Sequence, residues 1–186
     1  MGAVLKLGIP NNNVRRQYYD YLLEEYRNIH PLPTYELDIP YYEAAVNGNW
    51  QVMLNQMMKM YSENTSVRSL IEGERNVQGF MNALLNLNPY YLTAPEVELN
   101  HGYCDFFLMP DLMRYPMIGH SYILELKYLK TDASDGEAQS QWAEAVDQIR
   151  HYAEGPKVRL MIQDTQLHLI VVQIRGCKLQ KMEEIF

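Results

Sequence analysis

Apolar residues recur along this chain with two different spacings, which predict helices in some segments and strands in others. Apolar positions three or four residues apart predict helices, and short alternating or continuous apolar runs between turn residues predict strands. Helices are therefore expected over residues 14–26, about 39–47, 50–61, 70–87, 138–154 and, as a short one, 158–162. Strands are expected over residues 90–99, 103–109, 119–128, 167–174 and 178–185, after a short extended segment at 4–9.

The order of these segments predicts an α/β fold. A helix, three strands, a helix and two further strands are typical of a central mixed sheet flanked by helices. We expect two parts, an N-terminal helical segment over residues 1–65 and an α/β domain over residues 66–186. The Met-rich face of the 50–61 helix is expected in the core, with a partner surface as the alternative. The segment 131–137 is polar, and its residues 134–137 are expected to be a surface loop, with a flap over a site as the alternative.

Composition is that of an ordinary soluble globular protein, with 47% apolar and 21% charged residues. No apolar run approaches the roughly 18 residues that a membrane-spanning helix requires, so no membrane contact is expected. The N-terminus lacks the form of a secretory signal peptide. The two cysteines do not make a disulfide framework, and a reducing cytoplasm is the expected location.

The chain carries a formal net charge of −7. Proteins that bind phosphates usually present a basic face, so this charge counts against tight nucleic-acid binding by the chain alone. Bound metal ions would add local positive charge, and a nuclease is therefore not excluded.

Ionisable residues interrupt two of the predicted apolar strands. Asp105 lies within the 103–109 strand, and Glu125 and Lys127 lie near the end of the 119–128 strand. Side chains alternate along a strand, so Glu125 and Lys127 point to the same face. Ionised groups are costly to bury unless they are paired or bound to a metal. If the two strands pair, these groups converge as the parts of a divalent-metal hydrolytic site.

Further features of these strands and of other residues bear on that interpretation. A lone E-x-K pattern is more often an ordinary surface pair, and Lys127, as a strand-end lysine, is expected to be largely solvated. Asp111 follows the 103–109 strand and is expected to be a loop acid. His168 lies in a buried strand and is expected to be structural, and the histidines show no spacing typical of a metal site.

This arrangement resembles the PD-(D/E)XK nuclease superfamily, whose core motif is an acid on one strand and E-x-K on the next. Residues 74–80, Glu-Arg-Asn-Val-Gln-Gly-Phe, resemble the family's E-R-x-Y-H-G-F helix, with Gln78 where His is frequent. Gln148 and Tyr152 form the Q-x-x-x-Y pattern of the helix that follows E-x-K in the exonuclease-like branch. The resemblance implies a restriction-endonuclease-like core.

The resemblance also implies hydrolysis of nucleic acid, DNA by preference, with Mg²⁺ or Mn²⁺ as cofactor. Asp105, Glu125 and the backbone carbonyl of Leu126 would bind the metal. Lys127 would orient or activate the attacking water, and Glu74 would hold a metal-bound water. Three further side chains would contact the substrate or support the metal-binding groups: Gln78, Gln148 and Tyr152.

Residues 9–16 carry a second resemblance. They are similar to the P-N-x-E-V-R element of bacterial AAA-ATPase-like proteins that have a C-terminal PD-(D/E)XK domain, with Asn13 in place of the Glu. This implies an AAA-ATPase domain as a partner, in the same or a longer protein. No Walker A pattern occurs in these residues, so the P-loop would lie outside this chain.

Two alternatives belong to other functional classes. The acidic charge and the Tyr- and Met-rich N-terminal helices favour a catalytically silent, nuclease-like interaction or regulatory module of a larger AAA-ATPase-like protein. A small-molecule hydrolase lacks a G-x-S-x-G element or another nucleophile motif. The oligomeric state stays open, a homo-oligomer included.

Overall fold

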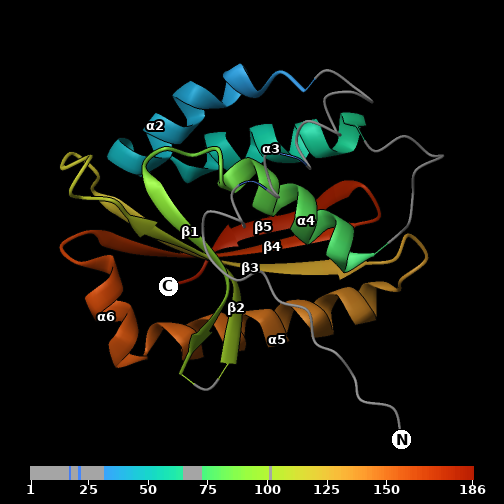
Figure 1. Ribbon diagram of the computed structural model, residues 1–186. Coiled ribbons are helices and arrows are strands. Elements are labelled where there is room, and N and C mark those ends of the chain that lie inside the picture. Colours follow the sequence, from blue (N-terminus) through green and yellow to red (C-terminus); the bar gives the residue numbers. More distant parts are fainter. Residues whose placement is uncertain (1–16, 18–20, 22–31, 65–72, 101) are drawn as a thin grey trace, which may run out of the picture.

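The computed structural model describes residues 32–64, 73–100 and 102–186, together with Gln17 and Tyr21. Figure 1 shows a sheet between two groups of helices. The elements are η1 (Thr34–Leu37), α2 (Asp38–Asn47), α3 (Trp50–Asn64), α4 (Glu74–Leu85), β1 (Tyr91–Leu99), β2 (Gly102–Pro110), β3 (His120–Leu129), α5 (Asp135–Ala153), α6 (Pro156–Ile162), β4 (Gln166–Arg175) and β5 (Lys178–Glu184).

The five strands form one mixed sheet in the order β1-β2-β3-β4-β5. Strands β3 and β4 are parallel, and the other neighbouring pairs are antiparallel. A parallel pair needs a crossover connection, which α5 and α6 provide between β3 and β4. The arrangement confirms the predicted α/β fold and is that of a restriction-endonuclease-like core.

Alternation along β3 divides the apolar core between the two faces of the sheet. Tyr122, Leu124 and Leu126 pack with α2, α3 and α4 on one face. Ile123 packs with α5 and α6 on the other face, which is also the face where Lys127 meets α5. The apolar positions of β3 therefore anchor both helical layers, and its Glu-x-Lys pair lies on the α5 side.

The predicted helices and strands agree with the described elements to within a few residues, apart from the start of α5. The methionines of α3 are buried, as predicted for a core helix. Helix α4 begins at Glu74, with Gly73 as its N-cap, and ends at Leu85. The predicted start of that helix at residues 70–72, the segments 4–9 and 14–26 and the motif at 9–16 lie outside the described residues, apart from helical Gln17 and Tyr21. The division of the chain near residue 65 stays a prediction.

Helix α5 begins at Asp135, so the prediction of a loop through residue 137 was wrong at its end. Ser134 caps the helix: its Oγ accepts a hydrogen bond from Glu137 N at 3.2 Å, and Glu137 Oε2 accepts one from Ser134 N at 2.7 Å. This reciprocal pair is a capping box. These two hydrogen bonds stabilise the polar first turn of α5. The pattern of apolar residues does not reveal this turn, whereas the Ser-x-x-Glu spacing does.

His168 is a structural histidine, as predicted. Its Nδ1 lies 2.6 Å from Glu184 Oε1, and its Nε2 lies 2.8 Å from Nδ1 of His120. The ring also stacks on Tyr122. These contacts join β3, β4 and β5 at the end of the sheet opposite Lys127. Within the described residues, none of the helices has the length and apolar character needed to cross a membrane.

Candidate active site

The candidate site lies where β2 separates from β3. The two strands pair over only three positions, from Leu108 opposite Tyr122 to Phe106 opposite Leu124. Asp105 is the next residue of β2, beside this paired stretch. On β1, Glu96 lies between the paired residues Pro95 and Val97 and has a φ of 51°. That backbone conformation is uncommon for a residue other than glycine and marks a local bend. Figure 1 shows the β1–β2 hairpin crossing the sheet at this point.

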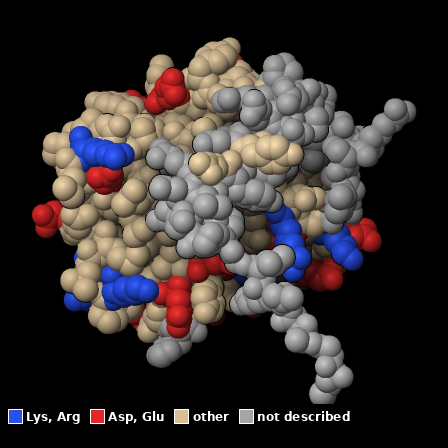
Figure 2. Space-filling model, viewed as in Figure 1, with Lys and Arg blue, Asp and Glu red and all other residues tan. Residues whose placement is uncertain are grey.

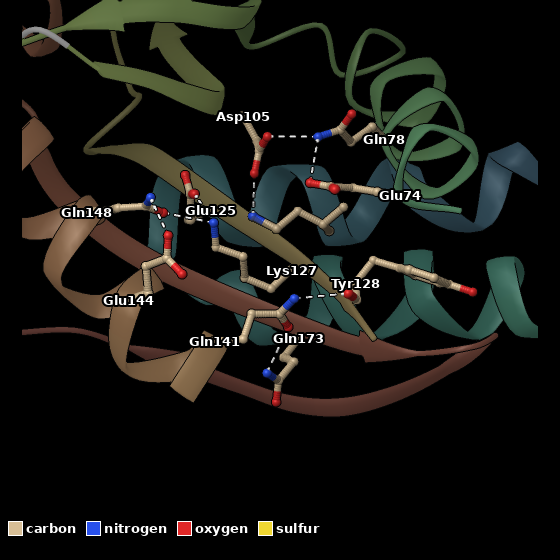
Figure 3. Close-up of polar contacts among 11 residues, drawn as sticks. Glu74, Gln78, Asp105, Glu125, Lys127, Tyr128, Gln141, Glu144, Gln148 and Gln173 are labelled. Atoms are coloured by element: carbon tan, nitrogen blue, oxygen red, sulfur yellow. Dashed lines mark hydrogen bonds and ion pairs between the residues drawn. The ribbon is translucent and has the colours of Figure 1, made fainter. Parts of the chain in front are cut away.

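The separation leaves backbone groups of β3 available to side chains. Leu126 N donates a hydrogen bond of 2.7 Å to Asp105 Oδ2, so a carboxylate takes the place of a ladder partner. Asp105 Oδ1 accepts a second hydrogen bond, of 2.9 Å, from Gln78 Nε2 on α4. Gln78 Nε2 also lies 3.5 Å from Glu74 Oε1. The predicted residues of α4 and β2 therefore form one connected group (Figure 3).

The Glu-x-Lys pair of β3 continues the group toward α5. Lys127 Nζ lies 3.0 Å from Glu125 Oε1 and donates a hydrogen bond of 2.8 Å to Gln148 Oε1. Gln148 Nε2 donates in turn to Glu144 Oε1 at 3.3 Å. Figure 3 shows this chain of side chains on the α5 side of β3. The lysine is thus held from both sides, by an acid on its own strand and by an amide on the helix.

Burial sets the electrostatics of the two carboxyl groups. Loss of solvent raises the pKa of Asp105 to about 6, and the Leu126 N–H and the Lys127 ammonium offset only part of that effect. Loss of solvent, together with the charge of Asp105, raises the pKa of Glu125 to about 7. Glu125 is only 4% exposed, and its Oε2 is a buried acceptor without a hydrogen-bond partner among the described residues. An uncompensated buried acceptor of this kind favours a bound cation or donor.

The donor set fits a hard divalent cation. Mg²⁺ prefers oxygen ligands and is held in proteins by one or two carboxylates with several waters retained. Asp105 and Glu125 supply two carboxylates, and a cation beside them would favour their ionised forms. In the described part of the chain, no cluster of three or more His, Cys, Asp or Glu side chains is placed to hold a metal. The fit therefore rests on the two carboxylates and on the unpaired Glu125 Oε2.

The structure brings most of the predicted site residues together, with two differences of environment. The Lys127 side chain is 17% exposed, so the expectation of a largely solvated lysine was wrong, because Glu125 and Gln148 enclose it. Tyr152 is 6% exposed and packs against Gly102. Burial and the nearby negative charge of Glu125 and Asp105 raise the pKa of its hydroxyl to about 12. Tyr152 therefore lies beneath the site, as part of the core.

Asp111 does not belong to this group. It follows β2 in a turn, where its carboxylate accepts a hydrogen bond from Arg114 N and lies 3.7 Å from Arg114 Nε. Asp105 and Asp111 are six residues apart along an extended segment, about 20 Å at the usual rise of a strand. The expectation of a loop acid is confirmed.

Two contributions to the site were absent from the sequence prediction. The N–H of Leu126 orients Asp105, a contact that was not considered, and the predicted role of the Leu126 carbonyl as a metal ligand stays a prediction. Glu144 was not considered, although it lies four residues before Gln148 on the same helix, a spacing that places two side chains on one face. That spacing is the signal that could have identified it.

Comparison with known protein families shows the superfamily to which the chain belongs. The family model of the PD-(D/E)XK nuclease superfamily matches residues 72–184, and this chain belongs to that superfamily. The matched segment contains each residue of the group described above, from Glu74 to Tyr152. Members of the superfamily are generally dependent on divalent metals, and membership implies nucleic acid as the partner. Searches against curated proteins and against solved structures give no match.

Proposed function

We propose that this chain is a metal-dependent nuclease that hydrolyses phosphodiester bonds, with Asp105 and Glu125 as ligands of Mg²⁺ or Mn²⁺. The observation that carries the proposal is the convergence of Asp105, Glu125 and Lys127 where β2 and β3 separate, with Glu125 Oε2 left unpaired. The Leu126 carbonyl would be a further oxygen ligand.

Each side chain of the group has a role that follows from its contacts. A bound divalent ion would lower the pKa of a water molecule and offset charge at the scissile phosphate. Lys127 would orient the attacking water or stabilise developing negative charge. Gln148 would hold the ammonium in place through its 2.8 Å hydrogen bond. Gln78 would fix the orientation of Asp105 and link it to Glu74, which would hold a water molecule.

The distribution of charge supports a nuclease whose binding of phosphate depends on the metal. On the face shown in Figure 2, the acidic and basic side chains of the described residues are interspersed among uncharged residues and do not gather into a basic stripe. With a formal net charge of −7, attraction of phosphate would come mainly from the metal and from individual cations such as Lys127. DNA is the favoured substrate. The motif at residues 9–16 supports action together with an AAA-ATPase-like domain, and the two free cysteines, Cys104 and Cys177, favour the cytoplasm.

Metal binding tests the proposal without requiring the natural substrate. We expect calorimetric titration with Mg²⁺ to show binding to the wild-type protein and a loss of at least tenfold in affinity for Asp105→Asn and for Glu125→Gln, about 1.4 kcal/mol or more. Asp111→Asn is the matched control, because it makes the same change at an acid that lies in the turn after β2. Equal Mg²⁺ affinity in the wild type and in both site variants would overturn the metal assignment.

A second candidate is a nuclease-like interaction module that has no catalytic activity. The acidic net charge favours it, and the intact Asp, Glu and Lys group counts against it. Retention of Mg²⁺ by a wild-type protein that cleaves no nucleic acid would favour this second candidate.

A further inference from the structure

Two cavities flank the candidate site, and they differ in charge. One, of about 650 Å³, lies between the end of β3 and α5 and is lined by Asp132, Glu137 and Glu144 against a single Lys130. The other, of about 400 Å³, lies between α4 and the β1–β2 hairpin and is lined by Asp105 and Glu96 with Arg75 as the cation. The three carboxylates of the first cavity repel a phosphate chain more than the two of the second, and a metal at Asp105 would offset one of those two. A nucleic-acid strand at Asp105 is therefore better accommodated on the α4 side.

The cavity on the α4 side combines two amide groups with a small apolar surface. Pro95 supplies apolar surface, Phe106 lies in the wall but is only 2% exposed, and Arg75 is an exposed cation on the lining. Asn82 is 8% exposed, and its Oδ1 accepts a hydrogen bond of 2.8 Å from Asn86 Nδ2. Its own Nδ2 is a donor in the wall of the cavity.

Gln78 contributes the complementary group. Its Nε2 donates to Asp105 Oδ1 at 2.9 Å, which leaves the amide Oε1 as an acceptor for a ligand. A donor and an acceptor beside the Pro95 ring match the edge and one face of a nucleobase, which proteins bind by hydrogen bonds to the edge and by packing on the ring.

The cavity has room for a larger side chain at Gly79. A Cβ placed on Gly79 would meet no atom within 4 Å, and Gly79 lines the cavity. The volume of the cavity, about 400 Å³, lies within the roughly 300–1,000 Å³ range of small-ligand pockets. A base that is paired and stacked in a duplex would have to leave the stack to enter such a pocket, at a cost of a few kcal/mol. An unstacked base enters without that cost.

We propose that the cavity bounded by α4 and the β1–β2 hairpin is a nucleobase pocket, which receives one unstacked base next to the phosphate held at Asp105. The pocket selects single-stranded nucleic acid, and Arg75 contacts a neighbouring phosphate. This inference rests on the proposed function for the identity of the adjoining site, and it specifies the class of substrate.

Filling the cavity tests the inference by binding alone. We would measure fluorescence anisotropy of a short labelled oligodeoxythymidine, of a hairpin duplex and of an abasic oligomer of equal length, without added Mg²⁺. For Gly79→Leu we expect about tenfold weaker binding of oligodeoxythymidine, with a melting temperature at or above that of the wild type because leucine is the better helix former. Ser140→Leu is the matched control, since it adds the same side chain to α5 in the acidic cavity, and we expect it to bind as the wild type does.

Two further comparisons separate the base from the phosphate. The abasic oligomer and the duplex should bind wild-type protein about as weakly as oligodeoxythymidine binds Gly79→Leu. Arg75→Gln should weaken binding of all three probes and reduce the slope of log affinity against log salt concentration by about 1. Wild-type affinity in Gly79→Leu, or equal affinity of the wild type for the abasic oligomer and oligodeoxythymidine, would overturn the nucleobase pocket.

The outcomes keep this inference distinct from the proposed function. Cleavage by the wild type with unchanged binding in Gly79→Leu would retain the nuclease and reject the pocket. Selective binding of oligodeoxythymidine that Gly79→Leu loses, in a protein that cleaves nothing, would retain the pocket and reject the hydrolytic function.

Discussion

Asp105 and Glu125 carry an energetic cost when ionised, because Glu125 is buried and Asp105 is partly buried. Burial raises the pKa of Asp105 to about 6 and that of Glu125 to about 7, whereas carboxyl groups in an unfolded chain titrate near 4. Between these values the folded protein binds more protons than the unfolded chain. The free energy of unfolding contributed by the pair therefore falls as the pH rises from about 4 to about 7.

This fall in the free energy of unfolding with rising pH gives a prediction for the metal-free protein. In urea unfolding with EDTA, the wild type should lose stability relative to the double variant Asp105→Asn/Glu125→Gln as the pH rises from about 4 to about 7. Added Mg²⁺ at pH 8 should stabilise the wild type and leave the double variant unchanged. Parallel stability curves for the two proteins across this pH range would contradict the assignment of the raised pKa values to these two carboxyl groups.

At the scale of elements, the helix α5 and the β1–β2 hairpin meet at one tight contact. A Cβ on Gly102 would lie 2.5 Å from Cε1 of Tyr152, closer than non-bonded atoms approach. Tyr152 is almost fully buried, and its ring has little room to move. Glycine at the start of β2 therefore allows the hairpin to pack on α5 beneath the site.

Gly102→Ala should consequently destabilise the protein by about 1–3 kcal/mol, the usual cost of overpacking. Gly136→Ala is the matched control, because a Cβ there would have only one contact, at 3.9 Å from Ser134 Oγ, and α5 should gain from the better helix former. Chemical denaturation of both variants measures the effect. An unfolding midpoint for Gly102→Ala equal to that of the wild type would show that Tyr152 shifts freely, and the proposed packing would be wrong.

Sequence patterns predicted these elements well where one physical signal decides the outcome. Alternation in β3 placed Glu125 and Lys127 on one face, and helical spacing in α4 placed Glu74 and Gln78 together. The start of α5 was missed because side-chain hydrogen bonds, not apolar periodicity, stabilise its first turn. The enclosure of Lys127 and the contact of Leu126 N with Asp105 depend on where β2 leaves β3, and no local pattern in either strand encodes that separation.

At the scale of the whole molecule, the site joins the two helical layers across the sheet. Helix α4 reaches Asp105 through Gln78 from one face, and α5 reaches Lys127 through Gln148 from the other. Figure 1 shows these helices on opposite sides of the sheet, with the β1–β2 hairpin crossing between them. The separation of β2 from β3 is what allows groups from both layers to meet, so the geometry of the site depends on the packing of the complete core.

The most direct test of the nuclease assignment is Mg²⁺-dependent cleavage of single-stranded and duplex DNA and RNA by the wild type and by Lys127→Met. Methionine preserves much of the length of the enclosed lysine while removing its charge, and Lys178→Met makes the same change at an exposed position at the start of β5. We predict cleavage by the wild type and by Lys178→Met, and a loss of at least a hundredfold in Lys127→Met, the scale expected when one group that stabilises transition-state charge is removed. Absence of cleavage by the wild type, or equal cleavage by Lys127→Met, would contradict the assignment.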